Sequence, residues 1–250
     1  MPPTDRFVIS FAAEPPQEAL PYGRWADTLR GHFTTACREA DSEGVELGEP
    51  GEIKWFPDRT YYGRTYVPGV ARTGTGYEFF GFVSFSEGSD GQGAPTDFYA
   101  FADYTSELVE SNPDWKLDLN DEVIGHWRGE QGNVAEITLV WGVPQVAGGA
   151  TVTAELANLA VDQCEVLDER FTLIAPDNYR GDYLDVKLWS SRGELLAAES
   201  LYVEDDDGEP EGDETGSRDD ESGSDDDEAA SENDDGEPVR DEAQPGGATG

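Results

Sequence analysis

Hydrophobic positions follow a helical period in one long stretch of the chain. Over residues 24–40 apolar side chains recur every three or four positions, which places them on one stripe of an α-helix. The stripe consists of Trp25, Leu29, Phe33, Ala36 and Ala40. Polar and arginine side chains occupy the positions between them. The pattern therefore predicts one amphipathic helix near the N-terminus.

Most of the remaining chain alternates with a period of two, or forms short apolar runs between turn residues, as β-strands do. Residues 77–85, YEFFGFVSF, are apolar on both faces, which is typical of a central strand. Residues 151–160 fit a strand and, after Val152, equally a helix. The predicted strands cover residues 6–12, 52–56, 60–67, 77–85, 97–104, 115–119, 122–128, 135–143, 151–160, 170–175, 183–189 and 195–203.

Many short strands separated by turns indicate a mainly β fold of the α+β type, either an antiparallel β-sandwich or a barrel-like domain. We expect residues 1–203 to form a single β-rich globular domain, and a subdivision near residue 110 stays open. Residues 53–85 should form an antiparallel strand pair at the centre of the first sheet. Phe79 and Phe85 should then pack on the helix stripe, because a sheet face must be covered.

The chain ends in a long acidic segment. Residues 204–250 contain 21 acids, two bases and almost no apolar side chains. Such a segment cannot bury enough apolar surface to offset its conformational entropy. We therefore expect a disordered acidic C-terminal tail.

The acidity is not confined to the tail. The chain has 55 acids against 16 bases, a net charge of −39, and residues 1–203 alone carry −20. Lysine is rare, with three residues against 13 arginines. This composition resembles that of proteins from salt-accumulating halophiles, whose carboxylate surfaces stay hydrated in molar salt. At that concentration the Debye length is about 3 Å, so like charges are screened from one another.

Cysteine usage and hydropathy bear on the compartment. Cys37 and Cys164 are far apart in the sequence, so we expect free thiols in a reducing environment. No basic segment followed by an apolar run marks a secretory signal, and no apolar stretch approaches the roughly 20 residues of a membrane span. The expectation is a soluble, cytoplasmic protein that does not enter a membrane, with its oligomeric state open.

One segment runs against the charge of the whole chain. Residues 53–77 contain four bases and one acid, a net charge of +3, together with six aromatic side chains. Arginine forks bind carboxylate or phosphate, and neighbouring rings supply stacking area. The candidate ligand-binding residues are Arg59, Arg64, Arg72, Tyr62 and Tyr66, close enough to share one ligand. In the alternative interpretation the rings fill the core and the arginines pair with acids.

Catalytic and cofactor motifs are absent from the sequence, which has no P-loop, no dinucleotide-binding glycine pattern, no Gly-x-Ser-x-Gly and no His-Glu-x-x-His. Since His32 and His126 are the only histidines, a multi-histidine metal site is excluded. We expect neither a metal nor another cofactor. The catalytic candidates are His126, as a general base, and Asp58, polarised by neighbouring arginines. Whether the chain is an enzyme stays open.

Three functions remain. The first is a non-enzymatic binding or interaction module whose arginine and aromatic surface takes an anionic small molecule or a protein partner. The alternative is a β-fold enzyme that acts on an anionic or sugar-like small molecule through carboxylates and a histidine. The third is nucleic-acid binding, which is disfavoured because the folded part is itself negative and counterion release weakens at high salt.

We predict that the folded part loses stability as KCl is lowered from molar concentration to about 0.1 M, where the Debye length grows to about 10 Å. The cause is mutual repulsion within a domain of net charge −20. Chemical unfolding followed by circular dichroism at several salt concentrations measures the effect. An unfolding midpoint independent of salt would show that the acids are well paired and that the halophile-type interpretation is wrong.

Overall fold

The computed structural model describes residues 25–42, 44–86, 95–128 and 134–201. These residues are mostly β-strand with antiparallel pairing, and they contain one α-helix, α1 (Ala26–Glu39). The fold class predicted from the hydrophobic pattern is confirmed. The predicted strand over residues 6–12 and the acidic tail from residue 204 lie outside the described residues.

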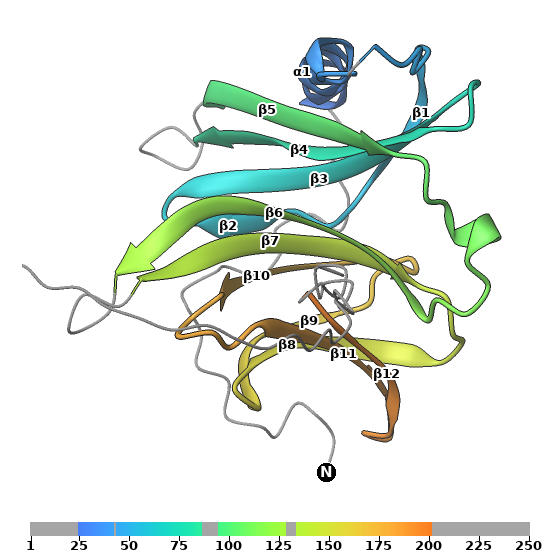
Figure 1. Cartoon of the computed structure of the whole chain (residues 1–250). Coiled ribbons are helices and arrows are strands. Elements are labelled where there is room, and N and C mark those ends of the chain that lie inside the picture. The colour runs from blue at the N-terminus through green and yellow to red at the C-terminus, as the bar shows by residue number, and fades with distance from the viewer. Residues whose placement is uncertain (1–24, 43, 87–94, 129–133, 202–250) are drawn as a thin grey trace, which may run out of the picture. The chain divides into compact units, whose positions relative to one another are not determined.

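The described strands form three sheets (Figure 1). The first has the order β1-β3-β4-β5, with a short β2 paired to β3, and comprises β1 (Pro50–Trp55), β2 (Arg59–Tyr61), β3 (Arg64–Thr73), β4 (Glu78–Ser86) and β5 (Thr96–Thr105). The second has the order β10-β7-β6 and comprises β6 (Leu117–Arg128), β7 (Val134–Pro144) and β10 (Phe171–Asp177). The third has the order β12-β11-β8-β9 and comprises β8 (Gly149–Leu156), β9 (Leu159–Glu165), β11 (Leu184–Ser190) and β12 (Leu195–Ser200). A short 3₁₀-helix, η3 (Val109–Ser111), lies between β5 and β6 in the chain.

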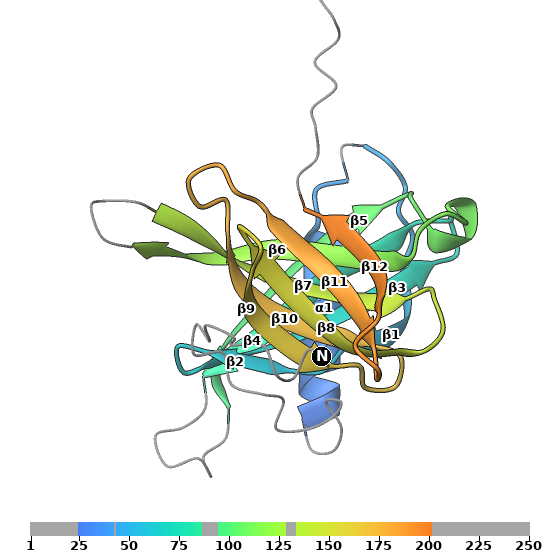
Figure 2. The ribbon, with the colours of Figure 1, turned by 90° about the horizontal axis from the view of Figure 1, so that it is seen from below.

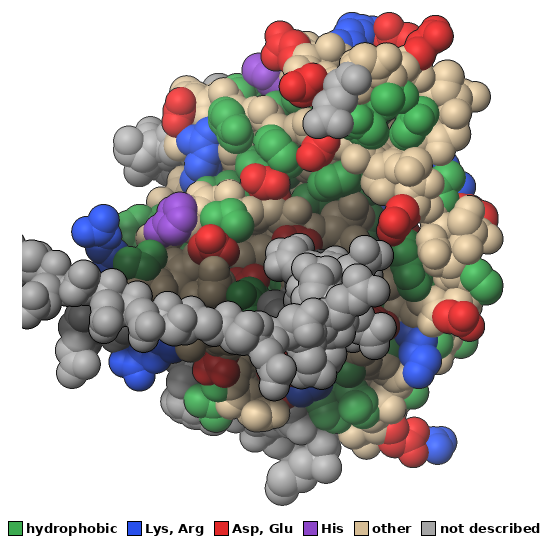
Figure 3. All heavy atoms as spheres, viewed as in Figure 1, with side chains coloured by type: hydrophobic (Ala, Val, Ile, Leu, Met, Phe, Trp, Pro, Cys, Tyr) green, Lys and Arg blue, Asp and Glu red, His purple; other side chains and the backbone are tan. Residues whose placement is uncertain are grey.

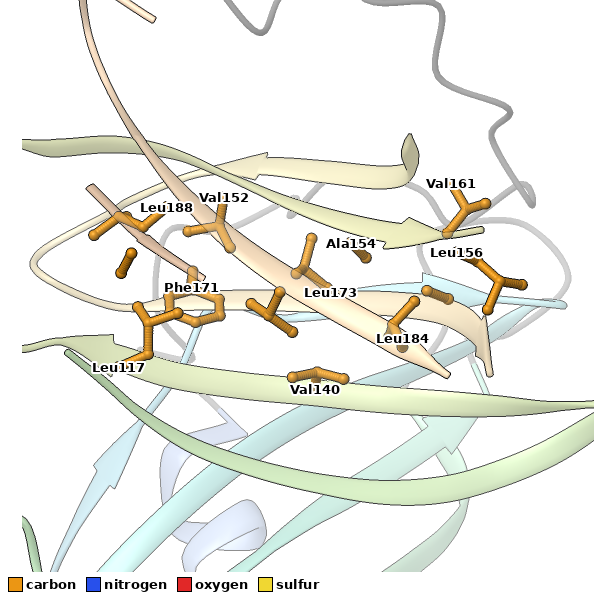
Figure 4. Close-up of a cluster of buried hydrophobic side chains, with 13 residues drawn as sticks. Leu117, Val140, Val152, Ala154, Leu156, Val161, Phe171, Leu173, Leu184 and Leu188 are labelled. Carbon is orange, nitrogen blue, oxygen red and sulfur yellow. The ribbon is translucent and has the colours of Figure 1, made fainter. Parts of the chain in front are cut away.

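Three buried clusters join these elements in layers. Helix α1 covers one face of the first sheet through Leu29, Phe33 and Cys37. The other face of the first sheet packs on the second sheet, and the second sheet packs on the third, which lies in the foreground of Figure 2. Figure 4 shows how side chains from the second and third sheets meet in the last of these interfaces.

Strand β4 explains why the first sheet has two cores. Alternate side chains of a strand point to opposite faces. Phe79, Val83 and Phe85 face the helix, whereas Phe82 and Phe80 face the second sheet. Strands β3 and β5 pair with the two edges of β4, and α1 and the second sheet cover its two faces, so its apolar run is buried. The prediction of a central strand with Phe79 and Phe85 packed on the helix stripe is confirmed.

Strands β7 and β10 of the second sheet are also buried on both faces. Along β7, Ile137, Leu139 and Trp141 contact the first sheet, whereas Val140 contacts the third. The neighbouring β10 has no exposed residue over its whole length. A sheet between two others needs near-continuous apolar strands, and β7 and β10 supply them.

Two hairpins depart from the sequence prediction. Residues 60–67 are not one strand, because β2 ends at Tyr61 and β3 begins at Arg64. The two residues between them, Tyr62 and Gly63, both have positive φ, as the type I′ hairpin turn requires. The run 151–160 likewise contains the turn between β8 and β9, so neither the single strand nor the helix is present.

Strand β3 continues through Pro68 to Thr73, beyond the predicted end at residue 67. Pro68 lies inside β3, pairs in register with Phe82, and its carbonyl accepts a hydrogen bond from the Phe56 backbone at 2.9 Å. The partner strand β1 ends at Trp55 opposite Gly69. Pro68 therefore lies just past the end of β1, where it accepts a hydrogen bond from Phe56 and has no N–H with which to return one.

We predict that Phe79→Ala destabilises the fold by about 3–5 kcal/mol, because it removes a ring that is 1% exposed between α1 and the first sheet. Urea unfolding at fixed high salt measures the difference. The control is Leu195→Ala on β12, where the side chain is largely exposed and the expected loss is below about 1 kcal/mol. Equal losses in the two variants would contradict the proposed packing of α1 on β4.

Candidate functional site

The structure places Arg59 in the interior. Arg59 is 2% exposed, and its Nη2 donates to both carboxylate oxygens of Asp162 on β9, at 2.6 and 2.7 Å. Asp162 also accepts the backbone N–H of Ile174 on β10 at 3.0 Å. Burial raises the pKa of Asp162, and the guanidinium of Arg59 opposes that rise. Arg59 therefore ties the first sheet to the other two.

The other two predicted arginines each bind different acids. Arg64 donates from Nε to Ser84 at 2.9 Å and from Nη1 to the Asp97 carboxylate at 2.6 Å. Arg72 donates from Nε to Glu78 at 2.9 Å and from Nη1 and Nη2 to the two oxygens of Glu110 at 2.7 and 2.8 Å. Both guanidinium groups are thus engaged within the fold.

The predicted arginine surface is not assembled. Arg64 and Arg72 stand at opposite ends of β3, eight residues and about 26 Å apart. Arg59 is enclosed, and the ring of Tyr66 fills the core between the first and second sheets. Tyr62 is 94% exposed at the hairpin turn. The structure does not bring these residues to one ligand, and the alternative pairing of arginines with acids describes their contacts.

A cleft lies beside Arg72, between the ends of the first and second sheets. It has a volume of about 150 Å³, and its walls come from β1, β3, β4, β6 and β7, from η3 and from the residue before β10. The lining residues are Lys54, Phe56, Val70, Arg72, Glu78, Val109, Glu110, Asp118, Asn120, Val143, Gln145 and Arg170. Three cations and three carboxyl groups therefore meet in one concave space.

Two of these cations, Lys54 and Arg170, form no salt bridge with a described carboxylate. Hydrogen bonds from Arg72 are the main cause of the lowered pKa of Glu110, and Lys54 adds a smaller electrostatic effect. Burial is the main cause of the raised pKa of Asp118, and Lys54 weakly opposes that rise. Lys54 therefore lies within electrostatic reach of both carboxyl groups, but it forms no ion pair with any described residue. Arg170 donates from Nη1 to the Trp55 carbonyl at 2.6 Å. Its guanidinium forms no ion pair with a carboxylate of the described residues. Lys54 and Arg170 can therefore receive an anion.

Asp118 differs from the other carboxyl groups of the cleft. Burial raises its pKa, and repulsion from Glu78 adds to that rise. Glu110 shows the opposite behaviour, since hydrogen bonds from Arg72 lower its pKa. Asp118 is therefore protonated more easily than an ordinary aspartate. The side chain of Asn120, beside it in the lining, adds a hydrogen-bond donor and acceptor.

The catalytic candidates from the sequence lie outside this cleft. His126 is exposed near the far end of β6, eight residues and about 26 Å from Asp118. Asp58 is buried before β2 and is not part of the lining. Burial raises the pKa of Cys37 and of Cys164 to about 12, so both thiols stay protonated at neutral pH.

The described residues give no metal centre and no membrane helix. No group of three or more His, Cys, Asp or Glu side chains among them is arranged to hold a metal ion. None of the helices found there is long and apolar enough to cross a membrane. Comparison with known families, with curated proteins and with solved structures finds no match for this chain.

We predict that Arg59→Met destabilises the fold by about 3–5 kcal/mol at neutral pH, because it leaves the carboxylate of Asp162 buried without its cation. The double variant Arg59→Met/Asp162→Asn should recover most of this loss, since the amide oxygen still accepts the Ile174 N–H. Arg64→Ala, at a half-buried pair, should cost no more than about 1 kcal/mol.

The same single variant has a definite pH dependence. With Arg59 removed, the pKa of Asp162 in the folded state rises further above its ordinary value of 3.8. The cost should be small below that pH, where the carboxyl is neutral in both states, and should grow as pH rises. Chemical unfolding at several pH values measures it. A double variant less stable than the single one would contradict this role of the pair.

Proposed function

We propose that the protein is a binding module for a small anionic molecule and that the cleft beside Arg72 is its site. The observation that carries this proposal is that two cations, Lys54 and Arg170, face one cleft and form no salt bridge with any described carboxylate. In a domain with a net charge of −20, such positions are favourable for a ligand carboxylate or phosphate.

The contacts of Arg72 support the assignment of anion binding to Lys54 and Arg170. Its three donor groups are occupied by Glu78 and Glu110, so it shapes the wall rather than receiving a ligand. Lys54 and Arg170 stand on β1 and immediately before β10, from the first and second sheets. A ligand between them would bridge two layers of the fold.

The size of the cleft limits the ligand. A volume of about 150 Å³ corresponds to roughly five water molecules, at about 30 Å³ for each. Drug-sized ligands occupy pockets of about 300–1,000 Å³, so this cleft suits a smaller molecule. The side chains of Asn120 and Asp118 would form hydrogen bonds with hydroxyl groups of the ligand. The ligand class is therefore a small hydroxylated carboxylate or phosphate.

An enzyme acting on an anionic or sugar-like molecule is the second candidate. It is favoured by one observation, the raised pKa of Asp118 beside Glu78 in the same cleft. A carboxyl group whose pKa is raised is a better proton donor to a leaving group than an ordinary carboxylate is.

We also propose that the chain functions in the cytoplasm at high salt. The reasons are its acidic composition and its free thiols.

We predict that Lys54→Met weakens binding of inorganic phosphate and of glycolate by tenfold or more. A charged hydrogen bond contributes about 1.5–3 kcal/mol, which corresponds to that factor. Rising unfolding temperature with ligand concentration, measured at constant KCl, reports the affinity. Phosphate also stabilises proteins nonspecifically, so the control is Arg192→Met, an exposed arginine in the turn between β11 and β12.

Stabilisation equal in Lys54→Met and in Arg192→Met would contradict the site. So would the absence of any saturable stabilisation in the unaltered chain. Turnover of a phosphate ester or glycoside that is lost in Asp118→Asn, with anion binding retained, would instead establish the enzyme alternative.

A further inference from the structure

Asp118 lies near the start of β6, and its side chain points toward the first sheet. Strand register fixes this direction, because Asp118 pairs with Val143, which packs on the cluster between the first and second sheets. Its chain neighbours Leu117 and Leu119 point the other way, into the cluster shared with the third sheet. The carboxyl group of Asp118 is therefore held between two sheets, where it lines the cleft beside Arg72.

Among the described acids of this lining, Asp118 alone forms no salt bridge. The two others, Glu78 and Glu110, are both bound by Arg72. Acidic side chains are also spread over the face of the molecule seen in Figure 3, including the right of the view, where η3 lies in Figure 1. A negative charge on Asp118 is therefore placed among other negative charges and has no cation bound directly to it.

The surroundings of Asp118 make its charge sensitive to a bound anion. The charged side chains around it, from β1, β3, β4, η3 and the residue before β10, are Lys54, Arg72, Glu78, Glu110 and Arg170. Burial is the largest cause of the raised pKa of Asp118, and the two glutamates add to the rise, whereas Arg72 and Lys54 oppose it. An anion bound to Lys54 offsets part of that opposing positive charge and adds a negative charge to the same cleft, so the pKa of Asp118 must rise further.

We propose that the cleft binds its anionic ligand together with a proton, and that Asp118 is the group that receives the proton. This inference rests on the proposed function of the cleft and adds a second species to what is bound there. An ionised Asp118 repels an anion in a space of about 150 Å³. A protonated Asp118 carries no charge, and its O–H can donate a hydrogen bond to an oxygen of the ligand.

The direction of the pH dependence follows from this coupling. If the anion raises the pKa of Asp118, protonation of Asp118 must raise the affinity for the anion by the same factor. Affinity is highest below the pKa of Asp118 in the free protein, where the carboxyl group is already neutral. It falls as pH rises from the pKa of the free protein to that of the complex, and stays low above the latter, where the ligand meets an ionised carboxylate.

The test uses the full chain and sulfate, because the charge of sulfate does not change between mildly acidic and mildly alkaline pH. Isothermal titration calorimetry at constant KCl measures the affinity at each pH. We predict that sulfate binds about tenfold more tightly at the acidic end than at the alkaline end. Titrations in two buffers with different ionisation enthalpies should also show a net uptake of protons when sulfate binds.

Asp118→Asn replaces the carboxyl group by a neutral group of nearly the same shape. We expect this variant to bind sulfate at alkaline pH about tenfold more tightly than the unaltered chain does, and with no dependence on pH. A merely structural role of Asp118 predicts weaker binding at every pH. The control is Asp182→Asn, which changes an exposed carboxyl group after β10, at the other end of the second sheet, and should keep the pH dependence.

The outcomes separate the proton from the anion site. An affinity that does not change with pH, or binding without proton uptake, would overturn the coupling and leave the cleft as an anion site. A pH dependence that persists in Asp118→Asn would also overturn it, because Glu78 or Glu110 would then be the group that titrates. If Lys54→Met binds sulfate as tightly as the unaltered chain does, the anion site itself is wrong. Proton uptake by the unaltered chain tests the coupling even if Asp118→Asn fails to fold, which circular dichroism reports.

Discussion

The buried contact between Arg59 and Asp162 joins all three sheets, and the rest of the described structure depends on it. The guanidinium comes from β2 in the first sheet, the carboxylate from β9 in the third, and the same carboxylate accepts the Ile174 N–H from β10 in the second. The apolar clusters between the layers supply most of the stabilisation, but apolar contact is not directional. A buried ion pair has a large desolvation cost and tolerates only one geometry. We infer that the main role of the pair is to fix the relative position of the layers, and that it contributes less to their stability.

That relative position creates the cleft beside Arg72. Lys54 belongs to the first sheet, Asp118 and Asn120 begin β6 of the second, and Arg170 stands immediately before β10. Arg170 also donates to the Trp55 carbonyl at the end of β1, so it clamps the two sheets at the edge of the cleft that it lines. The Arg59 contact lies on β2, only a few residues after this clamp in the chain. The site is therefore a product of how the layers meet, and no single strand contains it.

This origin explains what the sequence could and could not predict. Period alone located α1 and the doubly buried β4, because their apolar spacing is local. The hairpin at Tyr62 and Gly63 was missed because a tyrosine in the left-handed region carries no turn signal. Excess positive charge drew attention to Lys54 and Arg72, but Asp118 and Arg170 belong to no motif. Arg59 and Asp162 are 103 residues apart, so nothing local in the sequence reveals that they pair.

The acidic composition also limits how the proposed site can work. If the chain functions in molar salt, the Debye length of about 3 Å leaves attraction only between groups in direct contact. Long-range steering by the positive side chains would then be negligible, and a ligand must be held by short charged hydrogen bonds or by apolar burial. The cleft offers short charged hydrogen bonds through Lys54 and Arg170. Few cations are needed under these conditions, provided that they form no salt bridge within the fold. Arg59, Arg64 and Arg72 are neutralised by their own acids, which leaves the recognition role to Lys54, the lysine of the positive segment, and to Arg170, which the charge pattern of the sequence does not single out.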